Sequence, residues 1–214
     1  MLIQLIQHFP YDKLLDILDD VISTTEMTRF EDSLIAHRWA NFVIQEVLQQ
    51  CAQPGPKYRI VDVLLNNLTK VVMNVYACSV LDMALTCVGQ STHIHIAEQI
   101  VRTPELLGRM AIKASFVTRK CLSDVIQRVF FVLIQANHQM SLLYAKEQIR
   151  FVVPKMNKQY GTRILKAVAP EFITGEHWAH GSQTWTSKLP ATVEAEVLVG
   201  DLIKVWPDTD DEWF

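Results

Sequence analysis

One short pattern occurs three times in the chain at a constant spacing of 37 residues, at residues 37–45, 74–82 and 111–119. Asn41, Cys78 and Ser115 occupy equivalent places in the three copies, and an alanine stands immediately before each of them. Self-similarity at a fixed period of about 20 to 50 residues marks a stack of supersecondary units. Apolar positions repeat in such a stack because they pack on the neighbouring unit, so polar positions that vary between copies are free to face a ligand.

The stretches around these copies have the spacing of amphipathic helices. Leucine, isoleucine and valine recur three and four residues apart in residues 12–22 and 58–68, which is typical of a helix with one apolar face. Proline and glycine interrupt the apolar stretches at residues 54–56 and 89–91, where turns are expected. The pattern predicts an all-α fold built from stacked helices.

The copies also divide the chain into units. Residues 1–4 match residues 42–45, which predicts that the chain begins inside a unit and that Gln4 takes the place of Gln45. A weaker fourth copy lies at residues 158–166, further from the third copy than one period, so we expect an insertion between Gln127 and Tyr144. The expected divisions are a truncated unit at 1–30, complete units at about 31–67, 68–103 and 104–140, a C-terminal cap at 141–170 and a tail at 171–214.

Composition narrows the class of protein. Half of the 214 residues are hydrophobic, which is enough for one well-buried domain. The longest strongly apolar run, residues 129–134, is much shorter than the roughly 18 residues of a membrane span, and the N-terminal residues lack the features of a signal peptide. The four cysteines show no paired close spacing, and Cys51, Cys87 and Cys121 end their apolar stretches at roughly the repeat interval, which favours buried reduced thiols at these three positions. These features predict a cytoplasmic protein without a membrane partner.

Charge is distributed unevenly along the chain. The net charge of −3 combines a mildly basic body, residues 1–170, with an acidic tail, residues 171–214. The tail loses the helical periodicity and contains four of the five tryptophans. A mildly basic body is compatible with RNA binding, although most nucleic-acid modules are considerably more basic.

The string from Ala40 to Gln45, Ala-Asn-Phe-Val-Ile-Gln, resembles the repeat signature of the Pumilio (PUF) family of RNA-binding proteins. Residues 160–165 are similar to that family's C-terminal half-repeat, and the resemblance covers about residues 1–170. It implies a right-handed α-solenoid of three-helix PUF-type repeats that forms a partial crescent. The concave face of such a crescent binds single-stranded RNA at one base per repeat. The resemblance further implies an mRNA 3′ untranslated region as ligand, regulation of mRNA translation or decay, and protein partners on the convex face or the acidic tail.

The first copy has the chemistry to recognise a base. Residues four apart on a helix lie on one face, so Asn41 and Gln45 could both contact one base edge. Each amide offers a donor and an acceptor, which suits uracil, and Phe42 supplies a stacking plane worth about 1–3 kcal/mol per base. The alternative is that both amides simply face solvent.

The second copy places Cys78 and Asp82 at the base-edge positions and Ser79 at the stacking position. A carboxylate accepts from the N–H groups of guanine, whereas Ser79 has no aromatic face. Asp82 could equally be a solvated surface charge.

The third copy offers Ser115 and Arg119 for the base edge and Phe116 for stacking. Arginine presents only donors, which fits the acceptors of cytosine, and the pair resembles the cytosine-recognising combination of the family. Because RNA in that family runs antiparallel to the protein, the three copies would recognise 5′-C-G-U-3′. Arg119 could instead bind phosphate or pair with Asp82.

Catalytic and metal sites are not expected. His93 and His95 lie on opposite sides of a helix, and His177 and His180 have no third ligand nearby. The sequence contains no glycine-rich phosphate loop and no recognisable nucleophile motif. An enzyme and a cofactor are therefore not expected.

Two further functions stay open. The chain could be a degenerate helical-repeat scaffold that binds proteins, as the low charge of its body, Ser79 and the tryptophan-rich acidic tail suggest. It could also bind RNA independently of sequence in ribosome assembly, with a nucleolar location, and steep salt dependence without base preference would identify that case.

Overall fold

Short helices follow one another along the chain in the computed structural model, which describes residues 3–4, 8, 15–27, 29–116 and 120–170. Every regular element among these residues is helical, which confirms the all-α expectation. No helix in this part of the chain is long and apolar enough to cross a membrane. The helices are α2 (Leu15–Met27), α3 (Asn41–Gln50), α4 (Pro54–Asn66), α5 (Leu68–Met73), α6 (Val75–Cys87), α7 (Gln90–Arg102), α8 (Leu106–Phe116), α9 (Lys120–Gln135), α10 (Gln139–Val152) and α11 (Lys158–Val168), with 3-10 turns η2 (Phe30–Asp32) and η3 (Val153–Lys155).

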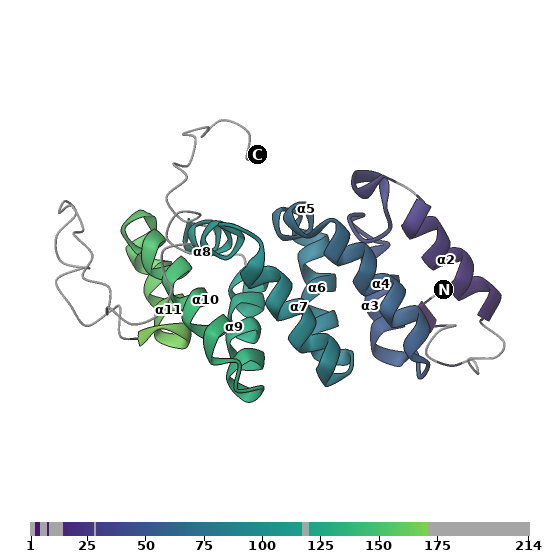
Figure 1. The fold of residues 1–214 in the computed structure, drawn as a ribbon. Coiled ribbons are helices and arrows are strands. Elements are labelled where there is room, and N and C mark those ends of the chain that lie inside the picture. The colour runs from purple at the N-terminus through teal and green to yellow at the C-terminus, as the bar shows by residue number, and fades with distance from the viewer. Residues whose placement is uncertain (1–2, 5–7, 9–14, 28, 117–119, 171–214) are drawn as a thin grey trace.

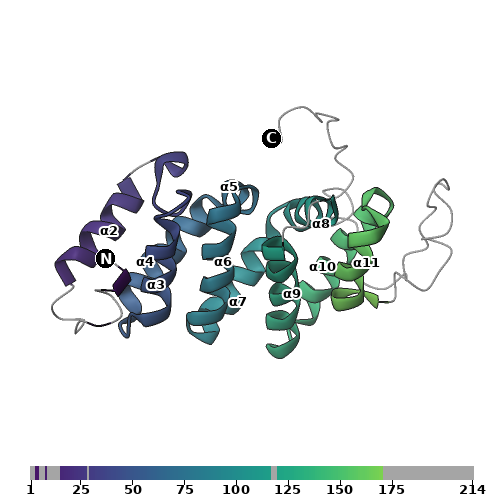
Figure 2. The same cartoon turned by 180° about the vertical axis from the view of Figure 1, so that it is seen from behind.

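The helices pack in three rows that run from one end of the molecule to the other (Figures 1 and 2). The middle row consists of α3, α6 and α9, each packed on the next. A second row consists of α2, α4, α7 and α10, and a third of α5, α8 and α11. Each complete triplet, such as α5, α6 and α7, therefore contributes one helix to each row.

The first two copies of the pattern share a hydrogen-bonded turn, which lies just before α3 in the first copy and forms the N-cap of α6 in the second. The ring nitrogen Nδ1 of His37 accepts hydrogen bonds from the backbone N–H groups of Trp39 (3.2 Å) and Ala40 (3.1 Å). Oδ1 of Asn74 accepts from the corresponding N–H groups of Tyr76 (2.9 Å) and Ala77 (3.0 Å). Such side chains satisfy donors that a helix N-terminus leaves unpaired. Structurally equivalent positions of α3 and α6 are therefore 37 residues apart in the sequence.

The apolar core follows the same register. Ile44 of α3 and Leu81 of α6 are fully buried at equivalent positions, and Leu48 and Leu85 are buried one turn later. Ile126 is buried in the same way on α9. The middle row is thus held together by apolar side chains that repeat with the units.

The third unit differs from the expected one. α8 has 11 residues whereas its counterpart α5 has 6, and α9 rather than α8 packs against α6. Extra residues therefore lie before α9, ahead of the expected place between Gln127 and Tyr144. Within that expected place α9 is also longer than α6, with 16 residues against 13. The expected boundary at residue 140 falls inside α10, which packs on α8 and α9 and so belongs to the same unit as they do.

The four cysteines form no disulfide, and all of them lie in the described residues. Cys51 is buried, as expected, whereas Cys87 and Cys121 are only half-buried; Cys78, which was expected to face a ligand, is buried as well.

His93 near the start of α7 should make the free energy of unfolding depend on pH. Burial lowers its pKa from the usual value, against a weaker raising effect of its hydrogen bond with the Ala84 backbone, and its Nε2 is buried with no partner among the described residues. A folded-state pKa below the unfolded one, about 6.5, means that the unfolded chain binds the proton more readily. We expect stability to fall as pH drops from about 7 through 6, and His93→Gln to flatten this slope in urea unfolding measured at several pH values. An unchanged slope in His93→Gln would contradict the assignment.

Candidate nucleic-acid interface

The side-chain amide of Asn41 makes all of its hydrogen bonds with residues of its own segment of the chain. Asn41 is 2% exposed, and its Nδ2 donates to the carbonyl oxygens of His37 and Arg38, both at 2.8 Å. Its Oδ1 accepts from Nε2 of Gln45 at 2.7 Å. With donor and acceptor both engaged and no accessible surface, Asn41 is not presented to a ligand, and the expectation that it contacts a base edge is wrong for this conformation. Gln45 is half-buried, so of the two predicted amides of α3 it is the one that a ligand can reach.

Two aromatic side chains are exposed at the start of α3. Phe42 is 50% exposed and Trp39, three residues earlier, is 65% exposed. The Arg38 guanidinium lies 4.7 Å from the centre of the Trp39 ring, within the range of a cation–π contact. Exposed aromatic rings are costly in water and are the planes on which unpaired bases stack. Trp39 was not among the predicted stacking residues, although its spacing of three from Phe42 indicates a shared helix face.

The second copy has one buried and two half-buried predicted residues. Cys78 is 1% exposed, so its expected contact with a base edge is also wrong. Ser79 and Asp82 are half-buried; the Ser79 hydroxyl donates to the Val75 carbonyl at 3.1 Å. The Asp82 carboxylate accepts from Nε of Arg128 on α9. Asp82 is therefore one member of an ion pair between neighbouring helices. Its partner is Arg128, whereas the sequence suggested Arg119 as a partner.

The thiol of Cys78 contacts that of Cys121 on α9. Hydrogen bonding with Cys121, then burial, raises the pKa of Cys78. The same hydrogen bond lowers the pKa of Cys121, where burial opposes it. The two thiols therefore lie against each other between α6 and α9.

The third predicted site is not in the middle row. Ser115 is fully buried at the end of α8, where its hydroxyl donates to the Ile112 carbonyl at 2.6 Å and accepts from the Asn157 backbone N–H at 3.0 Å. It joins α8 to the segment before α11, so its predicted contact with a base is wrong. Phe116 is 57% exposed at the end of the same helix, and Arg119 lies outside the described residues.

The equivalent of Asn41 in the third unit is Ser123 on α9. Residues 123–127, Ser-Asp-Val-Ile-Gln, match Asn-Phe-Val-Ile-Gln of the first copy. Nε2 of Gln127 donates to Oγ of Ser123 at 3.1 Å, as Nε2 of Gln45 donates to Asn41. Ser123 is 9% exposed, while Asp124 and Gln127 are half-buried. This matching string could have identified Ser123 from the sequence. The constant spacing of 37 residues pointed to Ser115 instead.

Other predicted positions contribute little to a site. Gln4 is exposed in a helical segment, and His177 and His180 lie outside the described residues. Within the described part of the chain, no three histidine, cysteine or acidic side chains are grouped as a metal site would require.

Comparisons with protein-family models, with characterised proteins and with solved structures gave no match to this chain.

Proposed function

We propose that the chain is a PUF-like right-handed α-solenoid that binds single-stranded RNA along the exposed side of its middle row. The support is the repetition of one local geometry on α3 and α9. Gln45 and Gln127 occupy equivalent positions, each is fixed by a side chain one turn earlier, and each is half-buried rather than covered. An amide held in this way offers a donor and an acceptor to one base edge.

The proposed surface has one contact position on each middle helix. Gln45, Asp82 and Gln127 take the edge position of successive helices, and the Phe42 ring provides the stacking plane at the first. The buried Asn41 and Cys78 support these positions from beneath and do not touch the ligand. Recognition therefore depends on one side chain per helix where two were expected.

This arrangement limits the affinity of the chain for RNA. The Asp82–Arg128 pair neutralises the middle of the surface, so the surface does not have the concentrated positive charge that gives most nucleic-acid modules their affinity. Stacking contributes about 1–3 kcal/mol per base, which must offset the cost of association. The chain should bind a short motif weakly, in keeping with a role in mRNA translation or decay that depends on partner proteins.

A selection from a random pool of single-stranded RNA tests the proposal. The full chain should enrich a short motif, and Gln127→Ala should relax the preference at one position because it removes the only amide of α9 assigned to an edge. Gln135→Ala, at the exposed end of α9, is the matched control and should enrich the unchanged motif. Failure to enrich any motif, or the same motif from Gln127→Ala, would contradict base recognition by this surface.

The second candidate is a helical-repeat scaffold that binds proteins. It is favoured by exposed apolar side chains on α10, where Met140, Leu143 and Phe151 are 59%, 54% and 55% exposed. Exposed apolar patches commonly mark interaction surfaces. In this case the selection yields no motif. Sequence-independent RNA binding, the third candidate, would show steep salt dependence without a preferred base.

A further inference from the structure

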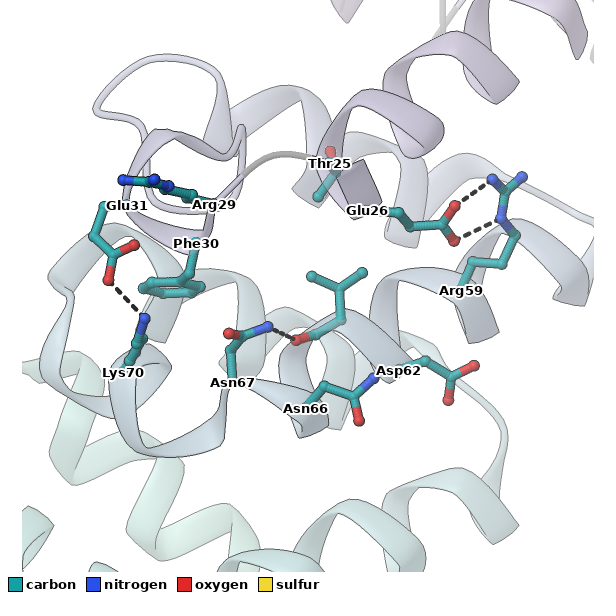
Figure 3. Close-up of a pocket in the computed structure, with 11 residues that line it drawn as sticks. Thr25, Glu26, Arg29, Phe30, Glu31, Arg59, Asp62, Asn66, Asn67 and Lys70 are labelled. Carbon is teal, nitrogen blue, oxygen red and sulfur yellow. Dashed lines mark hydrogen bonds and ion pairs between the residues drawn. The ribbon is translucent and has the colours of Figure 1, made fainter.

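A polar cavity of about 830 Å³ lies at the α2 end of the molecule, apart from the middle row (Figure 3). Its walls come from the end of α2, from η2, from α4 and from the start of α5. Helices α5 and α8 precede α6 and α9, but residues 30–40 ahead of α3 form only a 3-10 turn followed by turns. The cavity lies beside this segment, where the first unit has no full helix. Its volume is within the range of about 300–1,000 Å³ that ligand sites commonly have.

Two ion pairs stand on opposite sides of this cavity (Figure 3). Glu26 at the end of α2 pairs with Arg59 of α4 at 2.6 Å, and Glu31 of η2 pairs with Lys70 of α5 at 2.8 Å. Hydrogen bonding from Arg59 lowers the pKa of Glu26, and hydrogen bonding from Lys70 lowers that of Glu31. These four charges are therefore already satisfied within the protein and hold the cavity walls together.

Three other lining side chains have no such partner among the described residues. Arg29, Asp62 and Asn66 line the cavity and make no hydrogen bond or ion pair with the part of the chain that the structure describes. Asn67 uses only its Nδ2, which donates to the Val63 carbonyl at 3.0 Å, so its Oδ1 is available. The cavity thus offers one cation outside the two ion pairs, Arg29, which also acts electrostatically on Glu31, one carboxylate, Asp62, and the amides of two neighbouring asparagines.

This set of groups selects a chemical class of ligand. The lining contains three cations and three carboxylates, so a phosphate-rich ligand such as RNA would meet as many repelling as attracting charges. A purely apolar molecule would leave the polar walls unpaired, which is costly. A ligand with both signs of charge and its own amide groups satisfies all of them. An extended peptide is such a ligand, because its backbone N–H and C=O groups are not used internally.

We propose that this cavity binds an extended peptide segment of a partner protein. An acidic side chain of the peptide pairs with Arg29, a basic one pairs with Asp62, and the peptide backbone hydrogen-bonds with Asn66 and Asn67. No lining residue belongs to α3, α6 or α9, so this site is independent of the proposed RNA surface. The cavity and the RNA surface can therefore be occupied at the same time, and each can be tested separately.

Selection from a displayed library of random linear peptides against the immobilised full chain tests the site. The enriched peptides should share an acidic and a basic residue at a fixed separation. A labelled synthetic peptide of that sequence should bind Arg29→Glu about tenfold or more weakly than the parent chain by fluorescence anisotropy, a loss that corresponds to one charge-assisted contact. It should bind Asn66→Ala about threefold to tenfold more weakly, which corresponds to one neutral hydrogen bond. A peptide with lysine in place of its acidic residue should bind Arg29→Glu better than the original peptide does.

Arg163→Glu is the matched control, because Arg163 is exposed on α11 at the other end of the molecule; it should leave peptide affinity unchanged. Asn66→Ala alters no charge and removes no internal partner, so its thermal unfolding should match that of the parent. Failure to enrich any peptide would overturn the proposal. So would equal affinity of the peptide for the parent chain and both variants, or displacement of the peptide by single-stranded RNA.

Discussion

Replacing Leu81 with alanine should lower the free energy of unfolding by about 2–5 kcal/mol, the range for deleting a fully buried leucine side chain. Leu81 is 0% exposed and lies on α6, which packs on α3 on one side and on α9 on the other. The cavity left in this position weakens both contacts of the middle row at once. Urea unfolding followed by circular dichroism measures the loss. It is large because total stabilities are only about 5–15 kcal/mol.

Leu143→Ala is the control for this substitution. It removes the same atoms from α10, where the side chain is 54% exposed, and should change stability by about 0.5 kcal/mol or less. Equal losses for Leu81→Ala and Leu143→Ala would show that α6 does not occupy the centre of the core.

Replacing Phe42 with alanine should weaken RNA binding by about fivefold to 150-fold, equivalent to the roughly 1–3 kcal/mol of one stacked base. Phe42 is half exposed on the first helix of the middle row, so the substitution removes little buried surface. Phe42→Tyr keeps the aromatic plane and should retain most of the affinity. The control is Phe151→Ala on α10, which is exposed to a similar degree but lies outside the middle row. Anisotropy with the selected RNA measures all three variants, and an unchanged affinity in Phe42→Ala would exclude stacking there.

The sequence pattern was sufficient to predict the helical class and the register of the first two units. That register is fixed by contacts that recur: His37 and Asn74 accept equivalent pairs of backbone hydrogen bonds, and Ile44 and Leu81 are buried at the same position. The third unit escaped prediction because α8 is longer than α5. A match at the expected spacing therefore fell on Ser115 in α8, while the corresponding helix started later in the chain.

The burial of the candidate contact residues could not be predicted from spacing. Periodicity indicates which residues share a helix face, but it does not show whether a polar side chain bonds to its own backbone. Asn41 does so through His37 and Arg38, which removes it from the surface. The polar cavity is a second such feature, because it depends on the absence of a helix in residues 30–40, a stretch that contains neither proline nor glycine as a break signal.

The measurement that tests the central claim most directly is a double-mutant cycle between Phe42 and the bases of the selected RNA. Each nucleotide is replaced in turn by an abasic one, and the affinities of the parent chain and of Phe42→Ala are compared. If the middle row binds bases one helix at a time, the cost of Phe42→Ala should disappear at a single abasic position and persist at all others. The same cost at every position, or none at any, would contradict binding of RNA bases by this surface.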